Sequence, residues 1–188
     1  HLHQRPWRWE SARLIAEHCI EIDAGAIRRL QIVESPDELG IACTATFALM
    51  ENAPLIGPKE IGDDELWTNF EYFLRAIVPV AESAGVKLAL HPDDPPMSPI
   101  AGSAALFRDV AAFQRALDMV PSPANGLLFC QGCYTEMLGQ GVFDAIRHFG
   151  RQGKVFYVHF RNVVGRVPSF REAFMDEGDI DMLAAMRT

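Results

Sequence analysis

The sequence predicts an α/β fold in which parallel strands are joined by helices. A helical stretch, a loop and a short strand follow one another three times along the chain. The helices are 63–84, 103–119 and 141–149, and the strands that follow them are 86–91, 126–130 and 155–160. Parallel neighbours need a long crossover connection, which a helix supplies. All three strands are apolar throughout, as expected of parallel strands that are covered on both faces.

The first of these helices carries signals at both ends and one breaker inside. Asp63 or Asp64 is a suitable N-cap, and Gly85 follows the last turn, where glycine commonly ends a helix. Pro79 lies in the interior, where its ring and missing N–H are expected to kink the helix or to split it in two.

The segments at the two ends of the chain complete the prediction. Residues 7–18 have helical spacing, and residues 26–33 fit a helix or a strand. The apolar run 41–50 is rich in β-branched residues and predicts a buried strand. The acidic segment 176–181 predicts a loop and N-cap, after which a last helix begins at Asp181.

Composition excludes several classes of protein. With 49% hydrophobic and 22% charged residues, the 188-residue chain has a globular composition, and no linker divides it, so we expect one domain over residues 1–188. No apolar run approaches the roughly 18 residues of a membrane span. The net charge of −8 and the absence of long basic runs argue against nucleic-acid or anionic-membrane partners. Four cysteines are too few for a disulfide scaffold, which favours a cytoplasmic protein.

Each predicted parallel strand ends on or near a side chain that can bind a metal. His91, Cys130 and His159 occupy these positions. In α/β barrels the C-terminal ends of the strands carry the ligands and catalytic groups, so the three residues are expected on one face. Imidazole and thiolate suit Zn²⁺, Fe²⁺ or Mn²⁺. The alternative for each histidine is a hydrogen-bonded residue of the core.

Polar residues beside these positions allow more than one interpretation. Arg161 could bind a substrate carboxylate through two parallel hydrogen bonds or form an ion pair at the rim. Tyr134 and Glu136 could contact a substrate or cap the next helix.

Cys133 lies three residues after Cys130 and suggests a zinc ribbon or a redox pair. A ribbon needs a second cysteine pair, which this sequence lacks, and a redox pair normally opens a helix. No helix is predicted at this point of the chain. The sequence therefore favours Cys130 alone as the functional cysteine.

Several segments together resemble the mannonate dehydratase family. They are KLALHPDDPP, PSPANGLLFCQG, VFYVHFRNV and FREAFMDEGDIDMLAAMR, and the resemblance extends over residues 60–188. It implies a TIM (β/α)₈ barrel of the xylose-isomerase-like type. It also implies a divalent metal, typically Mn²⁺, with Fe²⁺ or another divalent ion compatible with the same ligands. The implied reaction is the dehydration of D-mannonate to 2-keto-3-deoxy-D-gluconate in hexuronate breakdown.

By position, the resemblance assigns the family's metal ligands to His91, Cys130 and His159. The family's fourth ligand is an aspartate in an Arg-Pro-Asp-His motif, which this sequence does not contain. We therefore expect the barrel to be incomplete in this chain, with truncation at one or both ends and the acid–base groups beyond Thr188. Asp93 and Arg161 become candidates for binding the substrate.

Two alternatives to a sugar-acid dehydratase stay open. One is an isomerase or epimerase of sugars or sugar acids on the same barrel. The other is a non-catalytic protein that binds a metal or a sugar acid. Each has a small sugar acid as its partner, and the sequence leaves open whether the chain forms a homo-oligomer.

Overall fold

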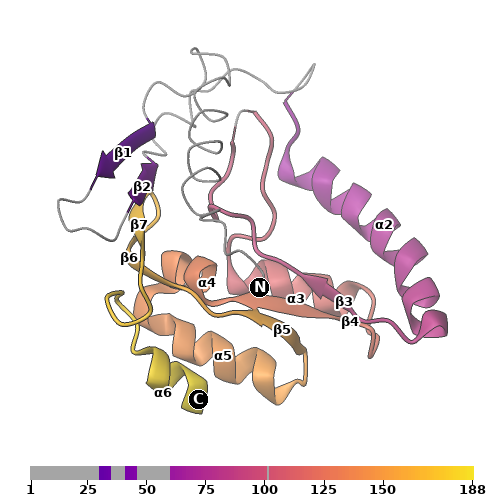
Figure 1. Cartoon of the computed structure of the whole chain (residues 1–188). Helices are drawn as coiled ribbons and strands as arrows, with labels where there is room; N and C mark the ends of the chain where they lie inside the picture. Colours follow the sequence, from indigo (N-terminus) through magenta and orange to yellow (C-terminus); the bar gives the residue numbers. More distant parts are fainter. Residues whose placement is uncertain (1–29, 35–40, 46–59, 101) are drawn as a thin grey trace, which may run out of the picture.

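The structure is a computed structural model that describes residues 30–34, 41–45, 60–100 and 102–188 (Figure 1). Its helices are α2 (Asp63–Ala84), α3 (Val110–Met119), α4 (Gln131–Leu138), α5 (Val142–Arg151) and α6 (Met182–Arg187), with a 3₁₀ turn η2 (Gly139–Gly141). Its strands are β1 (Leu30–Glu34), β2 (Ile41–Ala45), β3 (Leu88–Leu90), β4 (Asn125–Cys130), β5 (Val155–His159), β6 (Asn162–Arg166) and β7 (Ser169–Ala173).

The three predicted parallel strands form one sheet in the order β3-β4-β5. Both pairs are parallel, and Cys130 at the end of β4 is the register partner of His159 at the end of β5. Helix α3 connects the first pair, and α4, η2 and α5 connect the second. The α/β class and the parallel connections predicted from the sequence are therefore confirmed.

The core lies between this sheet and the helices that connect its strands. Phe113 of α3, Leu127 of β4 and Phe149 of α5 are fully buried. Tyr134 of α4 stacks on Phe129 with the ring planes 5° apart and the centroids separated by 4.0 Å. Helices α3, α4 and α5 thus contribute buried side chains to the same core cluster as the residues of β4, and this cluster includes Cys130 at the end of the strand.

Helix α2 ends as predicted but begins differently. Gly85 closes it in the left-handed conformation at φ 66°, which glycine adopts without strain. The N-cap is Gly62, whereas Asp63 and Asp64 lie in the first turn, where acidic groups favour the positive end of the helix. Asp63 there pairs with Arg108 at 2.6 Å. The helix continues through Pro79 without being split. Pro79 is exposed, so the backbone carbonyl four residues earlier, which has no N–H donor because of the proline, can bind water.

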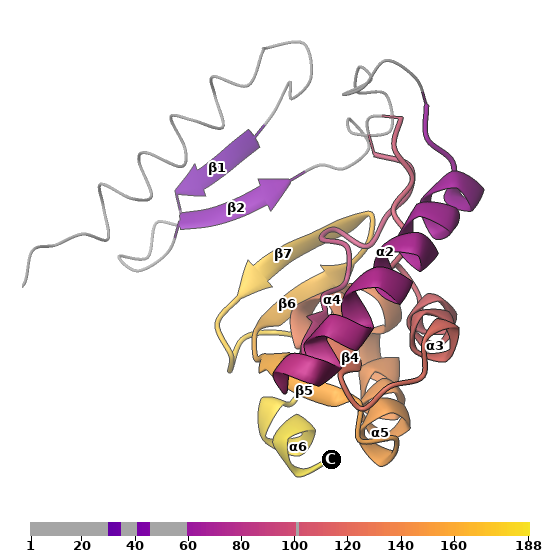
Figure 2. The ribbon, with the colours of Figure 1, turned by 90° about the vertical axis from the view of Figure 1, so that its right-hand side faces the viewer.

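Three elements differ from the sequence prediction. Helix α3 begins at Val110 rather than at 103, because the Asp109 side chain caps it by accepting from the Ala112 N–H at 2.8 Å. Helix α4 starts immediately after β4, where no helix was predicted. The chain after β5 forms an antiparallel hairpin, β6–β7, where no strand was predicted; Figures 1 and 2 show it beside the end of β5.

The last helix and the loop before it follow the prediction. The Asp181 side chain accepts from the Ala184 N–H at 2.9 Å and caps α6. The preceding loop is tied to β6 by buried Asn162, whose amide donates to the carbonyls of Met175 and Ile180. The acidic segment 176–181 is therefore a loop and helix cap, as expected.

Strands β1 and β2 pair antiparallel, with Leu30 opposite Ala45. The segment 26–33 was predicted to be a helix or a strand, and its described part is a strand, within β1. Strand β2 covers the first half of the strand predicted at 41–50. The helix predicted at 7–18 lies outside the described residues. Among the helices that the structure describes, none is long and apolar enough to cross a membrane.

Candidate metal centre

The structure brings His91, Cys130 and His159 together at the C-terminal ends of β3, β4 and β5. Their ligand atoms all lie within 4.8 Å of one another. The two imidazole rings are 5.1 Å apart between centroids. Cys130 is buried, His91 is half-buried and His159 is exposed, so the cluster opens from the core toward solvent. The convergence expected at the strand ends is therefore present.

The donor set fits a divalent transition metal. Metal–nitrogen bonds of about 2.1 Å and metal–sulfur bonds of about 2.3 Å keep two donors of one ion within about 4.4 Å of each other. The observed spacing is close to this limit, so small side-chain rotations would bring all three donors onto one ion. Two imidazoles and one thiolate are borderline-soft ligands, which suit Mn²⁺ less than Zn²⁺ or Fe²⁺ but exclude none of them.

His91 is oriented by its own backbone neighbour. Its Nδ1 atom lies 2.6 Å from the carbonyl oxygen of Pro92, a contact in which the ring nitrogen donates. A proton on Nδ1 leaves the lone pair on Nε2 free for a metal, as in most protein sites with histidine ligands.

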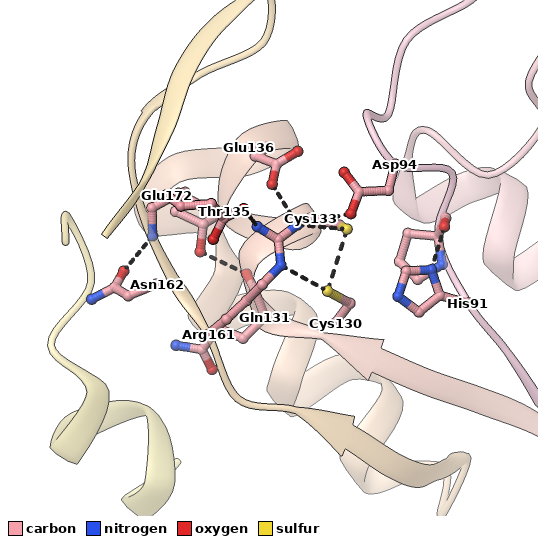
Figure 3. A network of polar contacts seen from close by, with 12 residues as sticks. His91, Asp94, Cys130, Gln131, Cys133, Thr135, Glu136, Arg161, Asn162 and Glu172 are labelled. Carbon is pink, nitrogen blue, oxygen red and sulfur yellow. Dashed lines mark hydrogen bonds and ion pairs between the residues drawn. The ribbon is translucent and has the colours of Figure 1, made fainter. Parts of the chain in front are cut away.

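The sulfur of Cys130 is surrounded by hydrogen-bond donors. The Cys133 thiol donates to it at 3.3 Å, and Nε of Arg161 donates at 3.4 Å (Figure 3). The bond from Cys133, opposed by burial and assisted by Arg161, lowers the pKa of Cys130. The same hydrogen bond, together with burial, raises the pKa of Cys133. Cys130 is therefore the thiolate of the pair, which is the form that binds a metal.

Arg161 lies at the centre of an acidic cradle rather than free in the site. Its Nη2 atom is 2.7 Å from Glu136, 3.2 Å from Asp94 and 3.2 Å from the sulfur of Cys133. Its Nη1 atom pairs with Glu172 of the β6–β7 hairpin. Asp94, Cys133 and Glu136 also have the spacing of a second metal cluster, but the guanidinium already provides the cation there.

The cradle contains a buried carboxyl group. Glu136 is fully buried, and its Oε2 atom has no hydrogen-bond partner among the described residues. Burial raises the pKa of Glu136 to about 7, although Arg161 opposes this shift. In the structure, Glu136 therefore forms an ion pair with Arg161, in place of the helix cap or substrate contact considered from the sequence. Tyr134, fully buried and stacked in the core, does not line the site either.

The close approach of Arg161 depends on Gly132. A Cβ atom at that position would lie 2.4 Å from Cζ of Arg161, well inside van der Waals contact. Gly132 follows β4 by two residues, so the first turn of α4 passes directly beneath the guanidinium. The absence of a side chain here lets the arginine reach both cysteines.

Asp93 is engaged by the backbone of its own loop. Its Oδ2 atom accepts from the Phe107 N–H at 2.7 Å, and its N–H donates to the Phe107 carbonyl at 3.1 Å. These two bonds fix the loop between β3 and α3. For Asp93 and Arg161, the proposed contacts with substrate stay predictions, and both already have partners in the protein.

The sequence did not single out the partners of Arg161 as a group. Asp94 and Glu172 are separated by most of the described chain, and no spacing in the sequence relates them. One signal was available: Arg161 lies two residues after the metal-competent His159, and a half-buried arginine needs carboxylates nearby.

The fold and the site define an α/β protein with a histidine–cysteine–histidine cluster at the ends of three parallel strands. The model of the D-mannonate dehydratase (UxuA) family matches residues 48–188. The chain belongs to this family.

Similar proteins carry the same name. Mannonate dehydratase 2 of Halalkalibacterium halodurans is 36% identical over 132 residues, which are 69% of this chain and 38% of that protein. The mannonate dehydratase of Streptococcus equi subsp. zooepidemicus is 37% identical over 129 residues, 68% of this chain and 35% of the relative. The crystal structure of the mannonate dehydratase from Streptococcus suis matches with a TM-score of 0.70 and 29% identity, covering 86% of this chain and 48% of that one. The chain thus spans less than half the length of these relatives.

Proposed function

We propose that the protein is a metal-dependent hydro-lyase that converts D-mannonate to 2-keto-3-deoxy-D-gluconate and water. Membership of the mannonate dehydratase family supports this proposal. The observation that carries it is the convergence of His91, Cys130 and His159 at the ends of three parallel strands. As an enzyme of hexuronate breakdown it would act in the cytoplasm on a small sugar acid.

We further propose that the three strands belong to a single (β/α)₈ barrel of the xylose-isomerase-like type. Consecutive strands are parallel neighbours in chain order, as in a barrel. The candidate ligands all lie at the C-terminal ends of the strands or directly after them, which is the face where barrel enzymes carry their active sites.

The metal in this proposal is Mn²⁺, which rests on the family resemblance and not on the softness of the ligands; Fe²⁺ or another divalent ion is the alternative for the same ligands. His91, Cys130 and His159 would hold it. When bound, a divalent cation stabilises the negative charge that develops on the oxygens of a sugar acid as a proton leaves.

The reaction removes the C2 proton and the C3 hydroxyl group as water. The electron pair of the C2–H bond forms the C2–C3 double bond, and hydroxide leaves C3 as it is protonated. The resulting enol then becomes the 2-keto acid. A general base and a general acid are required, and we assign neither role to a described residue. Arg161 and Asp93 are the candidates for orienting the substrate carboxylate and hydroxyl groups.

The test is an assay of the protein expressed from its complete reading frame. With Mn²⁺ and D-mannonate, we expect a 2-keto-3-deoxy acid, which the thiobarbiturate reaction detects. An epimer or isomer as the product would replace the proposal with the isomerase alternative. Binding of D-mannonate without turnover would indicate a non-catalytic binding protein.

A further inference from the structure

Cys130 and Cys133 lie side by side at the start of α4, and the proposed function uses only the first of them. Their sulfur atoms are 3.3 Å apart, and both thiols are free (Figure 3). Cys130 is the N-cap of the helix, and Cys133 lies in its first turn. In the sequence analysis, the absence of a predicted helix after Cys130 argued against a redox pair. The structure supplies that helix.

The surroundings of the pair favour the chemistry of a dithiol. Arg161 contacts both sulfurs, through Nε to Cys130 and through Nη2 to Cys133. The Cys133 thiol already points at the Cys130 sulfur as its donor. A positive charge and the N-terminus of a helix both stabilise a thiolate at the first position of such a pair. A disulfide bond of about 2.05 Å needs the two sulfurs to approach by only a little more than an ångström.

We propose that Cys130 and Cys133 form a reversible disulfide when the site holds no metal, and that this disulfide removes the thiolate ligand. The oxidant is a peroxide. The consequence for metal binding rests on the proposed function, whereas the disulfide itself does not. A bound metal would protect Cys130, because its sulfur electron pair would be engaged in the metal–ligand bond.

The chemistry balances in two steps. The Cys130 thiolate attacks one oxygen of hydrogen peroxide, the O–O bond breaks, and hydroxide leaves, so that Cys130 becomes a sulfenic acid. The sulfur of Cys133 then attacks the sulfur of the sulfenic acid, and the S–O bond breaks. The leaving hydroxyl takes the Cys133 proton and departs as water. The hydroxide of the first step becomes water by taking the proton that Cys130 lost on ionising. Two thiols thus lose two electrons, and one peroxide is reduced to two waters.

The experiment uses the metal-free chain, treated with hydrogen peroxide, alkylated with iodoacetamide and digested with trypsin. Arg115 and Arg147 bound one tryptic peptide that contains Cys130, Cys133 and no other cysteine. We expect this peptide to be unalkylated and about 2 Da lighter than its dithiol form, and dithiothreitol to restore two alkylation sites. Saturation with Mn²⁺ before the peroxide is expected to slow the loss of thiols at least tenfold.

Cys133→Ser is the matched control, because it leaves Cys130 without a resolving thiol. Its peptide should gain about 32 Da, the mass of the two oxygen atoms of a sulfinic acid, and dithiothreitol does not reverse this oxidation. The same gain in the wild-type peptide, without the lighter species, would overturn the proposal.

Binding of Mn²⁺ to the same samples separates this inference from the proposed function. Oxidised wild-type protein should bind Mn²⁺ at least 100-fold more weakly than reduced protein and recover after dithiothreitol. If reduced protein binds no Mn²⁺ although the disulfide forms, the proposed metal site is wrong. If reduced protein binds Mn²⁺ and no disulfide forms, the redox inference is wrong.

Discussion

The carboxyl group of Glu136 and the guanidinium of Arg161 form an ion pair below the ends of β4 and β5, with Oε1 and Nη2 2.7 Å apart. One partner is fully buried and the other half-buried. Arg161 also donates to the sulfur of Cys130. The pair therefore connects a buried acid in α4 to the candidate metal ligand at the end of β4, so its stability bears on the geometry of the site.

Glu136→Gln should make the stability of the protein less dependent on pH. Burial raises the pKa of Glu136 from its ordinary value of 4.5 to about 7, so the folded state binds the proton more tightly than the unfolded state. Stability from this group is present below pH 4.5 and is lost as pH rises to about 7. The difference in unfolding free energy between wild type and variant should shift by about 3 kcal/mol across this range. Urea unfolding at several pH values measures it.

Glu172→Gln is the control for this titration. Glu172 also pairs with Arg161, but its side chain is 53% exposed. We expect its removal to change the pH dependence far less than removal of Glu136. Equal effects of the two substitutions would show that the charge around Arg161, and not the burial of Glu136, determines how the unfolding free energy depends on pH.

Gly132→Ala should destabilise the protein even though alanine favours a helix. The new Cβ would lie 2.4 Å from Cζ of Arg161 and would push the guanidinium out of its cradle. We expect the loss of its contacts to outweigh the helix propensity gained, for a net cost of about 1–3 kcal/mol in unfolding free energy.

Gly150→Ala in α5 is the matched substitution. A Cβ at Gly150 would meet nothing within 4 Å, so this variant should be unchanged or more stable by up to about 1 kcal/mol. Thermal melts of both variants test the comparison, and a similar rise in melting temperature for the two would contradict a clash at Gly132.

The sequence predicted the metal-competent cluster because a strand end is a local feature. His91, Cys130 and His159 each follow an apolar run, and the parallel topology places such ends on one face. No knowledge of side-chain packing was needed. The same local reading located α2, α5 and the loop before α6, where caps and periodicity are visible in the sequence.

The cradle around Arg161 could not be predicted in this way. Its carboxylates come from the loop after β3, from α4 and from the β6–β7 hairpin, and ion pairs between distant segments leave no periodic signal. Helix α4 was missed because nearly all of its residues are buried, so it has no polar face to produce a period. The hairpin turns at Val167 and Pro168, which is not one of the common two-residue turn sequences.

Substitution of Asp93 can separate a structural role from a role in substrate binding. Asp93→Ala removes the acceptor of the Phe107 N–H and should cost about 2 kcal/mol of unfolding free energy. Asp93→Asn keeps an acceptor oxygen for the same N–H and should retain most of that stability. Urea unfolding compares the two. If both variants are as stable as wild type but D-mannonate binds more weakly to each, Asp93 acts on the substrate instead.

Removal of any one strand-end donor should abolish tight metal binding. Loss of an outer partner of a metal ligand typically costs 10–100-fold in affinity, so His91→Ala, Cys130→Ser and His159→Ala should each raise the Kd for Mn²⁺ by at least about 100-fold. His148→Ala is the control, because His148 lies on α5 and hydrogen-bonds to Gln114 of α3, away from the strand ends. Isothermal titration and metal content by mass spectrometry give the two readouts. If the Cys130 variant keeps its metal, the metal site does not lie at the end of β4. The Cys130 sulfur is the decisive donor, because it is the most buried of the three and accepts hydrogen bonds from both Arg161 and Cys133.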